Sequence, residues 1–83
     1  MKLLYFAWLR EKIGLSEEDV VLPAELVSVA DLVGWLSGRG AGYQAAFAQA
    51  KLVRCAIDQN FAQANSSIAG AKEIAFFPPV TGG

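Results

Sequence analysis

The sequence contains no histidine, the side chain that most often acts as a general base or metal ligand near neutral pH. Nucleophilic designs that pair serine or cysteine with an imidazole are therefore excluded. The single cysteine, Cys55, excludes a disulfide within the chain and would leave a zinc or iron-sulfur site without most of its ligands. We therefore expect no metal and no permanently bound cofactor.

A charge excess and a long apolar run are also missing. Seven basic and eight acidic side chains give a formal net charge of -1, too balanced to favour nucleic acid or an anionic membrane. The apolar run at 3–9 is far shorter than the ~20 residues that span a membrane, and charged residues follow it directly. We expect a cytoplasmic protein that binds no nucleic acid and no membrane, and that works with a protein partner or a small molecule.

The chain length suits one domain. Its 83 residues, 54% of them apolar, can bury one compact core. Bulky residues at 2–6 predict a first strand, and 7–13 has the pattern of a short helix that Gly14 ends. A second strand is predicted at 20–22, where Pro23 stops it. Because little chain separates the two strands, we expect an antiparallel hairpin.

The clearest predicted helix begins after Ser28 and ends at Gly38. Ser28 and Asp31 have the spacing of a capping box, and apolar residues recur at helical intervals behind them. Further along, the pattern predicts one more helix and then two strands, at 43–49, 52–58 and 73–77. These elements together predict an α+β roll with one mixed sheet around one main helix, the β-grasp pattern. We assign residues 1–77 to this domain.

Cys55 lies within the third predicted strand. Alternation places Cys55 on the same face as Val53 and Ile57, while Arg54 lies on the opposite face. A reactive thiol needs an exposed, electropositive setting. We therefore predict that Cys55 is a buried, inert hydrophobic residue.

The last residues, 78–83, form a predicted extended tail with the sequence Pro78-Pro79-Val80-Thr81-Gly82-Gly83. Two prolines stop the preceding strand and favour extended backbone, so the chain end should project from the domain. Glycine lacks a Cβ, so the end can enter a narrow channel and bring the Gly83 carboxylate to another enzyme. At ~3.3 Å per residue the tail would reach ~20 Å.

Aromatic residues near the tail predict a docking surface. In the last strand Ile74 and Phe76 share one face, and Phe77 points to the other. The same alternation places Phe6 on the outer side of the first strand, and Phe61 lies in a polar stretch. Exposed aromatics beside a tail suit a partner interface and favour a working tail over a merely flexible Gly-Gly end. The alternative is that they cover a secondary core.

Both ends and the middle of the chain resemble the small subunits of molybdopterin synthase. Residues 73–83, Glu-Ile-Ala-Phe-Phe-Pro-Pro-Val-Thr-Gly-Gly, are similar to the C-terminus of that family. Tyr5-Phe6-Ala7 with Arg10-Glu11 and Gly14 resembles its N-terminal pattern, and Ala56-Ile57-Asp58-Gln59 resembles its third-strand segment. Gly70-Ala71-Lys72 departs from the aspartate-rich turn often found there, which leaves charge matching with a partner open.

The resemblance implies a β-grasp fold and a tail, from Pro78 to Gly82, that binds inside a larger catalytic subunit, in an expected heterotetramer. An ATP-dependent enzyme would adenylate the carboxylate of Gly83 and convert it to a thiocarboxylate. This group would donate its sulfur to cyclic pyranopterin monophosphate in molybdenum cofactor biosynthesis. Phe6, Phe61 and Phe77 would form the apolar contact with the large subunit.

Three other functions stay open at this point. A sulfur carrier for thiazole synthesis or tRNA thiolation, or a ubiquitin-like protein modifier, would use the same terminal chemistry. The Phe-Phe-Pro-Pro segment weighs against another sulfur-carrier pathway and against a protein modifier. An interaction module with an incidental Gly-Gly end is the third, and it would keep its activity after removal of Gly82 and Gly83.

Overall fold

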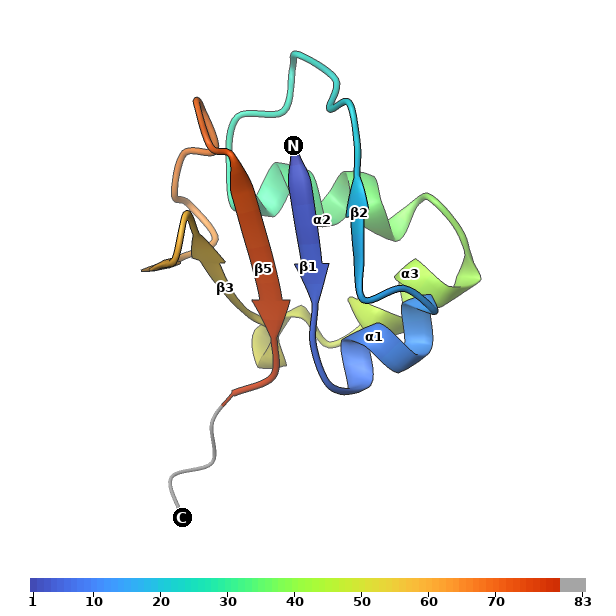
Figure 1. Ribbon diagram of the computed structural model, residues 1–83. Coiled ribbons are helices and arrows are strands. Elements are labelled where there is room, and N and C mark those ends of the chain that lie inside the picture. Colours follow the sequence, from blue (N-terminus) through green and yellow to red (C-terminus); the bar gives the residue numbers. More distant parts are fainter. Residues whose placement is uncertain (80–83) are drawn as a thin grey trace.

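The computed structural model describes residues 1–79, and within this range the strands form one mixed sheet in the order β2-β1-β5-β3-β4 (Figure 1). The elements follow one another as β1 (Lys2–Tyr5), α1 (Trp8–Ile13), β2 (Glu17–Asp19), α2 (Val29–Ser37), α3 (Ala41–Ala46), the 3-10 helix η1 (Ala50–Leu52), β3 (Arg54–Ile57), β4 (Asn60–Ala62) and β5 (Glu73–Phe77). The central strands β1 and β5 are parallel, and the other neighbours are antiparallel. This is the predicted α+β architecture.

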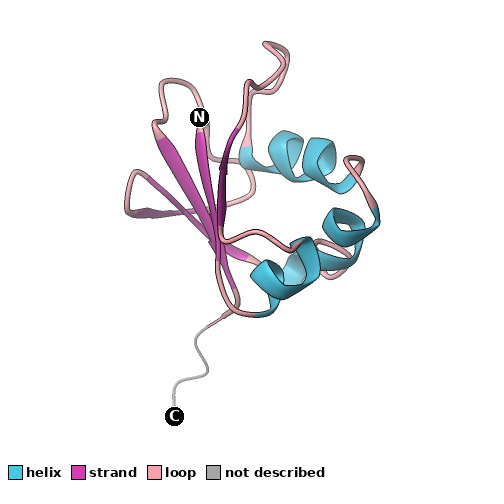
Figure 2. Cartoon of the chain, turned by 45° about the vertical axis from the view of Figure 1, so that its right-hand side comes forward, coloured by secondary structure: helices cyan, strands magenta, loops and turns pink. Residues whose placement is uncertain are grey.

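The core lies between the sheet and the helices, which all cover the same face of the sheet (Figure 2). Four side chains of the two central strands are at most 1% exposed, namely Leu3, Tyr5, Ile74 and Phe76. They pack with buried leucines of α1 and α2. The alternation expected for the first and last strands is thereby confirmed, and the opposite face of the sheet is left without a helical cover.

The main helix begins as predicted. The Ser28 hydroxyl accepts a hydrogen bond from the Asp31 N–H at 3.2 Å, and the Asp31 carboxylate accepts one from the Ser28 N–H at 3.1 Å. This reciprocal capping box satisfies two N–H groups that the first turn of a helix leaves without intrahelical partners.

The second strand lies earlier than the predicted 20–22, although the antiparallel hairpin is confirmed. Val20 still donates its N–H to the Met1 carbonyl at 2.9 Å. The register of β1 with β2 runs from Lys2 opposite Asp19 to Leu4 opposite Glu17, and Val21 is 94% exposed. The position of the partner strand, and not the β propensity of 20–22, therefore sets where β2 lies.

The predicted boundaries 52–58 and 43–49 are also wrong in part. Residues up to Leu52 belong to η1, so β3 is shorter than predicted, and α3 ends at Ala46. The strand β4 was not predicted because its three residues include asparagine and alanine, which are poor strand formers. A two-residue turn with positive φ at Asp58 (48°) and Gln59 (72°) joins β3 to β4.

Within residues 1–79, no helix has the length and apolar character needed to cross a membrane.

Candidate functional site

The predicted tail leaves the sheet from its middle. β5 lies between β1 and β3, and Pro78 and Pro79 follow Phe77 directly (Figure 1). Both prolines are partly buried, and neither has an N–H to continue the strand pairing. The remaining tail residues, Val80, Thr81, Gly82 and Gly83, lie outside the described residues, so the roles predicted for them stay predictions.

The structure brings two of the three predicted interface aromatics together. The rings of Phe61 and Phe77 lie 6.0 Å apart between centroids, at a tilt of 56°. Phe61 is 88% exposed, whereas Phe77 is only partly exposed. Phe61, from the strand β4 that was not predicted, lies against Phe77 and accounts for its partial cover. The aromatic pair sits directly before Pro78, at the base of the tail.

Phe6, the third predicted aromatic, is 46% exposed and follows the end of β1. Its N–H donates to the Phe76 carbonyl at 3.1 Å, which places the Phe6 backbone beside the end of β5. Within residues 1–79 the ring of Phe61 contacts that of Phe77, and the ring of Phe6 is not paired with either of them.

A row of small and apolar residues continues the aromatic pair across the uncovered face. The register places Leu4 opposite Ala75, Ala75 opposite Ala56, and Ala56 opposite Phe61. Together with Phe77 these residues form what we call the outer sheet face. Ala56 and Ala75 have small side chains and lie between the larger Leu4 and Phe61, so a partner can approach the strands closely at this point. Leu4, Ala56 and Ala75 were not singled out from the sequence, although strand alternation would have placed them here.

A hollow lies next to the base of the tail. Its lining combines the aromatic pair with the edge of the sheet and the first part of the tail, namely Arg54, Cys55, Phe61, Ala62, Gln63, Phe77 and Pro79. The opposing positions of Arg54 and Phe77 on paired strands place one cation beside the aromatic pair.

Comparison with known proteins identifies the family of the chain. A family model described as the ThiS family matches residues 3–83. The chain belongs to the ThiS family. Two curated relatives are named molybdopterin synthase sulfur carrier subunit. The one from Escherichia coli is 31% identical over 83 residues and the one from Haemophilus influenzae 37% over 86, each match covering 100% of this chain and 99% of the relative. The resemblance seen in the sequence is confirmed.

Solved structures show the same fold. SAMP1 from Haloferax volcanii has a TM-score of 0.71 at 24% identity, covering 100% of this chain and 98% of that one. A Pyrococcus furiosus chain assigned as molybdopterin converting factor, subunit 1, has a TM-score of 0.75 at 25% identity, covering 95% of each chain. The β-grasp assignment is therefore confirmed for this ThiS-family chain.

Cys55 of the ThiS-family chain is 6% exposed, as the strand pattern predicted. Its Sγ lies 3.6 Å from the Ala62 carbonyl oxygen, to which the thiol donates. Burial raises the pKa of the Cys55 thiol, which disfavours the nucleophilic thiolate. The nearby cation Arg54 is exposed and belongs to the opposite face of β3. The fold therefore offers Cys55 little of the environment that a reactive thiol requires.

A partly buried carboxylate lies away from the tail, at Glu18. Its oxygens accept hydrogen bonds from the hydroxyls of Tyr5 and Tyr43, each at 2.7 Å, and from Arg39 at 3.1 Å. Desolvation works to raise the pKa of Glu18, but the bonds from Tyr43, Tyr5 and Arg39 outweigh it and hold that pKa below its ordinary value. This network ties β2 to β1 and α3, so we read it as structural support.

Proposed function

We propose that this chain is the sulfur-carrier subunit of a molybdopterin synthase and that Gly83 carries the sulfur. The observation that supports this most is the full-length similarity to two curated carriers of that name. The Gly-Gly end agrees with it, since the chain reaches that end from a central strand beside the exposed Phe61. A carboxylate is the one reactive group that such an end can deliver.

The chemistry at Gly83 has two steps, both performed by an activating enzyme. The carboxylate oxygen first attacks the α-phosphorus of ATP, so that an acyl adenylate forms and pyrophosphate leaves. A sulfide-level sulfur donor then attacks the carbonyl carbon, a C–S bond forms, and AMP leaves with the oxygen. Activation in trans is required because a free carboxylate is a poor acyl donor and this sequence has no histidine to assist it.

The sulfur then passes to the pterin inside a large subunit, which supplies the catalytic side chains. The outer sheet face binds the large subunit, with Phe61 and Phe77 as the apolar anchor and Phe6 at its margin. Residues 78–83 enter the active site. Ordering them costs on the order of 1 to 2 kcal/mol per residue, so an apolar anchor next to the tail is needed to offset that cost.

The complex is proposed to be a heterotetramer with cyclic pyranopterin monophosphate as its substrate. We place it in the cytoplasm, where a thiocarboxylate and its sulfur donor would be kept reduced.

Single-turnover sulfur transfer tests the proposal. The chain is thiocarboxylated, mixed with the large subunit and the cyclic pterin, and molybdopterin is measured. A chain that lacks Gly82 and Gly83 should bind the large subunit through the intact outer sheet face but yield no molybdopterin. If the shortened chain supports the same yield, the proposed role of Gly83 is wrong. Covalent attachment of the full chain to lysines, without pterin conversion, would indicate a protein modifier instead.

A further inference from the structure

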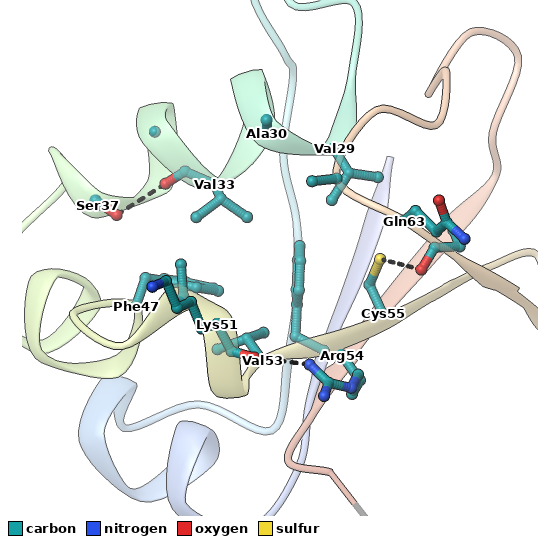
Figure 3. Close-up of a pocket in the computed structure, with 15 residues that line it drawn as sticks. Val29, Ala30, Val33, Ser37, Phe47, Lys51, Val53, Arg54, Cys55 and Gln63 are labelled. Atoms are coloured by element: carbon teal, nitrogen blue, oxygen red, sulfur yellow. Dashed lines mark hydrogen bonds between the residues drawn. The ribbon is translucent and has the colours of Figure 1, made fainter.

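A groove lies on the helix-covered side of the sheet, away from the outer sheet face. It has a volume of about 700 Å³ and runs between α2, η1, the start of β3 and the segment after β4. Figure 3 shows Val29 and Val33 of α2 on one side, with Lys51, Val53 and Arg54 across from them. Sites that bind small ligands have volumes of about 300 to 1,000 Å³, so the groove is large enough for one.

The groove reaches the hydrophobic core. Four of its lining residues belong to the core and are at most 6% exposed, namely Val29, Phe47, Cys55 and Phe76. The more exposed lining includes residues with very short side chains, which are Ala30, Gly34, Ala50, Ala62 and Ala64. Because these side chains are short, they leave room for an apolar ligand to contact the core and to be removed from water.

The charged residues of the groove have one sign. They are Lys51 and Arg54, and the described lining contains no aspartate or glutamate. A guanidinium nitrogen of Arg54 donates to the Lys51 carbonyl at 2.8 Å, which holds the two residues side by side. Within residues 1–79 neither cation forms an ion pair. An apolar groove with two cations is complementary to a ligand that has an apolar body and an anionic group.

The small number of polar side chains favours an alkyl chain over a peptide as the apolar body. Each peptide residue brings backbone polar groups, and burying them without partners costs free energy. Apart from the two cations, Ser37 and Gln63 are the polar residues of the described lining. The Ser37 hydroxyl already donates to the Val33 carbonyl at 2.8 Å. An alkyl chain needs no such partners, and a carboxylate at its end would meet the cations.

We propose that this groove binds a fatty acid. The alkyl chain lies between α2 and η1 against the core residues, and the carboxylate lies against Lys51 and Arg54. Binding is reversible and forms no covalent bond. The site is separate from the proposed carrier role, because the outer sheet face takes no part in it.

Titration of the full chain with decanoate, followed by amide NMR below micelle formation, tests the proposal. We expect saturable shifts of the amide signals of Val33, Val53 and Arg54. Decyltrimethylammonium is the matched control, since it has the same alkyl length and the opposite charge. It should bind at least ~10-fold more weakly, because it loses the charged hydrogen bonds and meets two like charges. Equal binding of the two ligands, or shifts confined to the outer sheet face, would overturn the proposal.

Chain length tests whether the alkyl body is buried. Octanoate is shorter than decanoate by two methylenes and keeps the same carboxylate. Burial of each methylene should tighten binding roughly fourfold, so decanoate should bind at least ~10-fold more tightly than octanoate. Equal affinities would show that the chain stays in water and would contradict the assigned position. If a blocked peptide Val-Leu-Val-Asp-Leu shifts the groove amides and decanoate does not, the occupant is a protein segment and the fatty acid assignment is wrong.

Two kinds of variant separate the walls of the groove from its charges. Gly34→Leu places a side chain into the groove from a position where a Cβ meets nothing within 4 Å, and it should abolish decanoate binding. Lys51→Glu should weaken decanoate and tighten decyltrimethylammonium without filling the groove. Arg10→Glu, on an exposed residue outside the lining, makes the same charge change and should alter neither affinity. Unchanged decanoate affinity in a folded Lys51→Glu or Gly34→Leu chain would overturn the proposal.

Discussion

Truncation of Phe61 should weaken binding of the large subunit while leaving the isolated domain nearly unchanged. Phe61 is 88% exposed, so almost its whole side chain remains to be buried by a partner. Full burial of a phenylalanine is worth about 1.5 to 3 kcal/mol. We therefore expect Phe61→Ala to cost about 2 kcal/mol of binding free energy, which corresponds to roughly a 30-fold higher Kd at 1.4 kcal/mol per tenfold.

The cost to the fold should be smaller. Phe61 loses one ring contact, that with Phe77 at 6.0 Å, and aromatic pairs contribute about 0.5 to 1.5 kcal/mol. Because this pair is largely open to solvent on the Phe61 side, we expect the lower end of that range. Phe77→Ala should cost more stability than Phe61→Ala, since Phe77 is partly buried.

Calorimetric titration of the large subunit with each variant, alongside urea unfolding of the free chains, measures both quantities. Val21→Ala is the matched control, because Val21 is a 94% exposed apolar residue outside the outer sheet face. Val21→Ala should bind as the unaltered chain does. If Phe61→Ala also binds with unchanged affinity, the outer sheet face is not the docking surface and the reasoning from exposure fails.

Three further predictions concern stability and the thiol. Gly42→Ala should destabilise the fold by about 1 to 3 kcal/mol, because the added Cβ would lie 2.5 Å from the Lys12 carbonyl oxygen. In the control Gly34→Ala the Cβ meets nothing within 4 Å, so this variant should stabilise α2 by roughly 0.5 to 1 kcal/mol. Urea unfolding measures both changes. Cys55→Ala should leave sulfur transfer intact and cost about 1 kcal/mol of stability, whereas complete loss of transfer in the folded variant would bring the thiol into the mechanism. The pKa of Glu18 is lower in the folded than in the unfolded chain, so its stabilising contribution is present above the unfolded pKa of about 4.3 and is lost as pH falls through the folded value. Glu18→Gln should flatten acid unfolding below about pH 5, and an unchanged acid limb would contradict the hydrogen-bond network.

Strand alternation was sufficient to predict the two central strands from the sequence. Ile74 and Phe76 had to share a face, and the structure buries both. The same logic gave the inward direction of Cys55. It does not apply to Phe6, which follows the end of β1 and is 46% exposed. It could not predict that Phe77 is partly covered, because the covering ring comes from β4, two strands away in the sheet order.

Features that depend on long-range packing could not be predicted from the sequence. The position of β2 depends on where β1 begins, and local β propensity at 20–22 gave the wrong place for it. A groove of about 700 Å³ lies between α2 and η1, and its shape depends on how these two helices pack, which no local pattern encodes. Of the candidate site, the sequence therefore predicted the tail and the aromatic residues, while the apolar row Leu4, Ala56 and Ala75 became evident from strand register.

The most direct measurement of sulfur carriage is the intact mass of the chain after incubation with its activating enzyme, ATP and a sulfur source. We expect a gain that equals one sulfur replacing one oxygen, on the C-terminal fragment, in both the unaltered chain and Cys55→Ala. A chain without Gly83 serves to test whether the enzyme requires the native end, and we expect no gain there. If the added sulfur is instead found on Cys55, with the Gly83 carboxylate unmodified, this chain does not carry sulfur at its terminus.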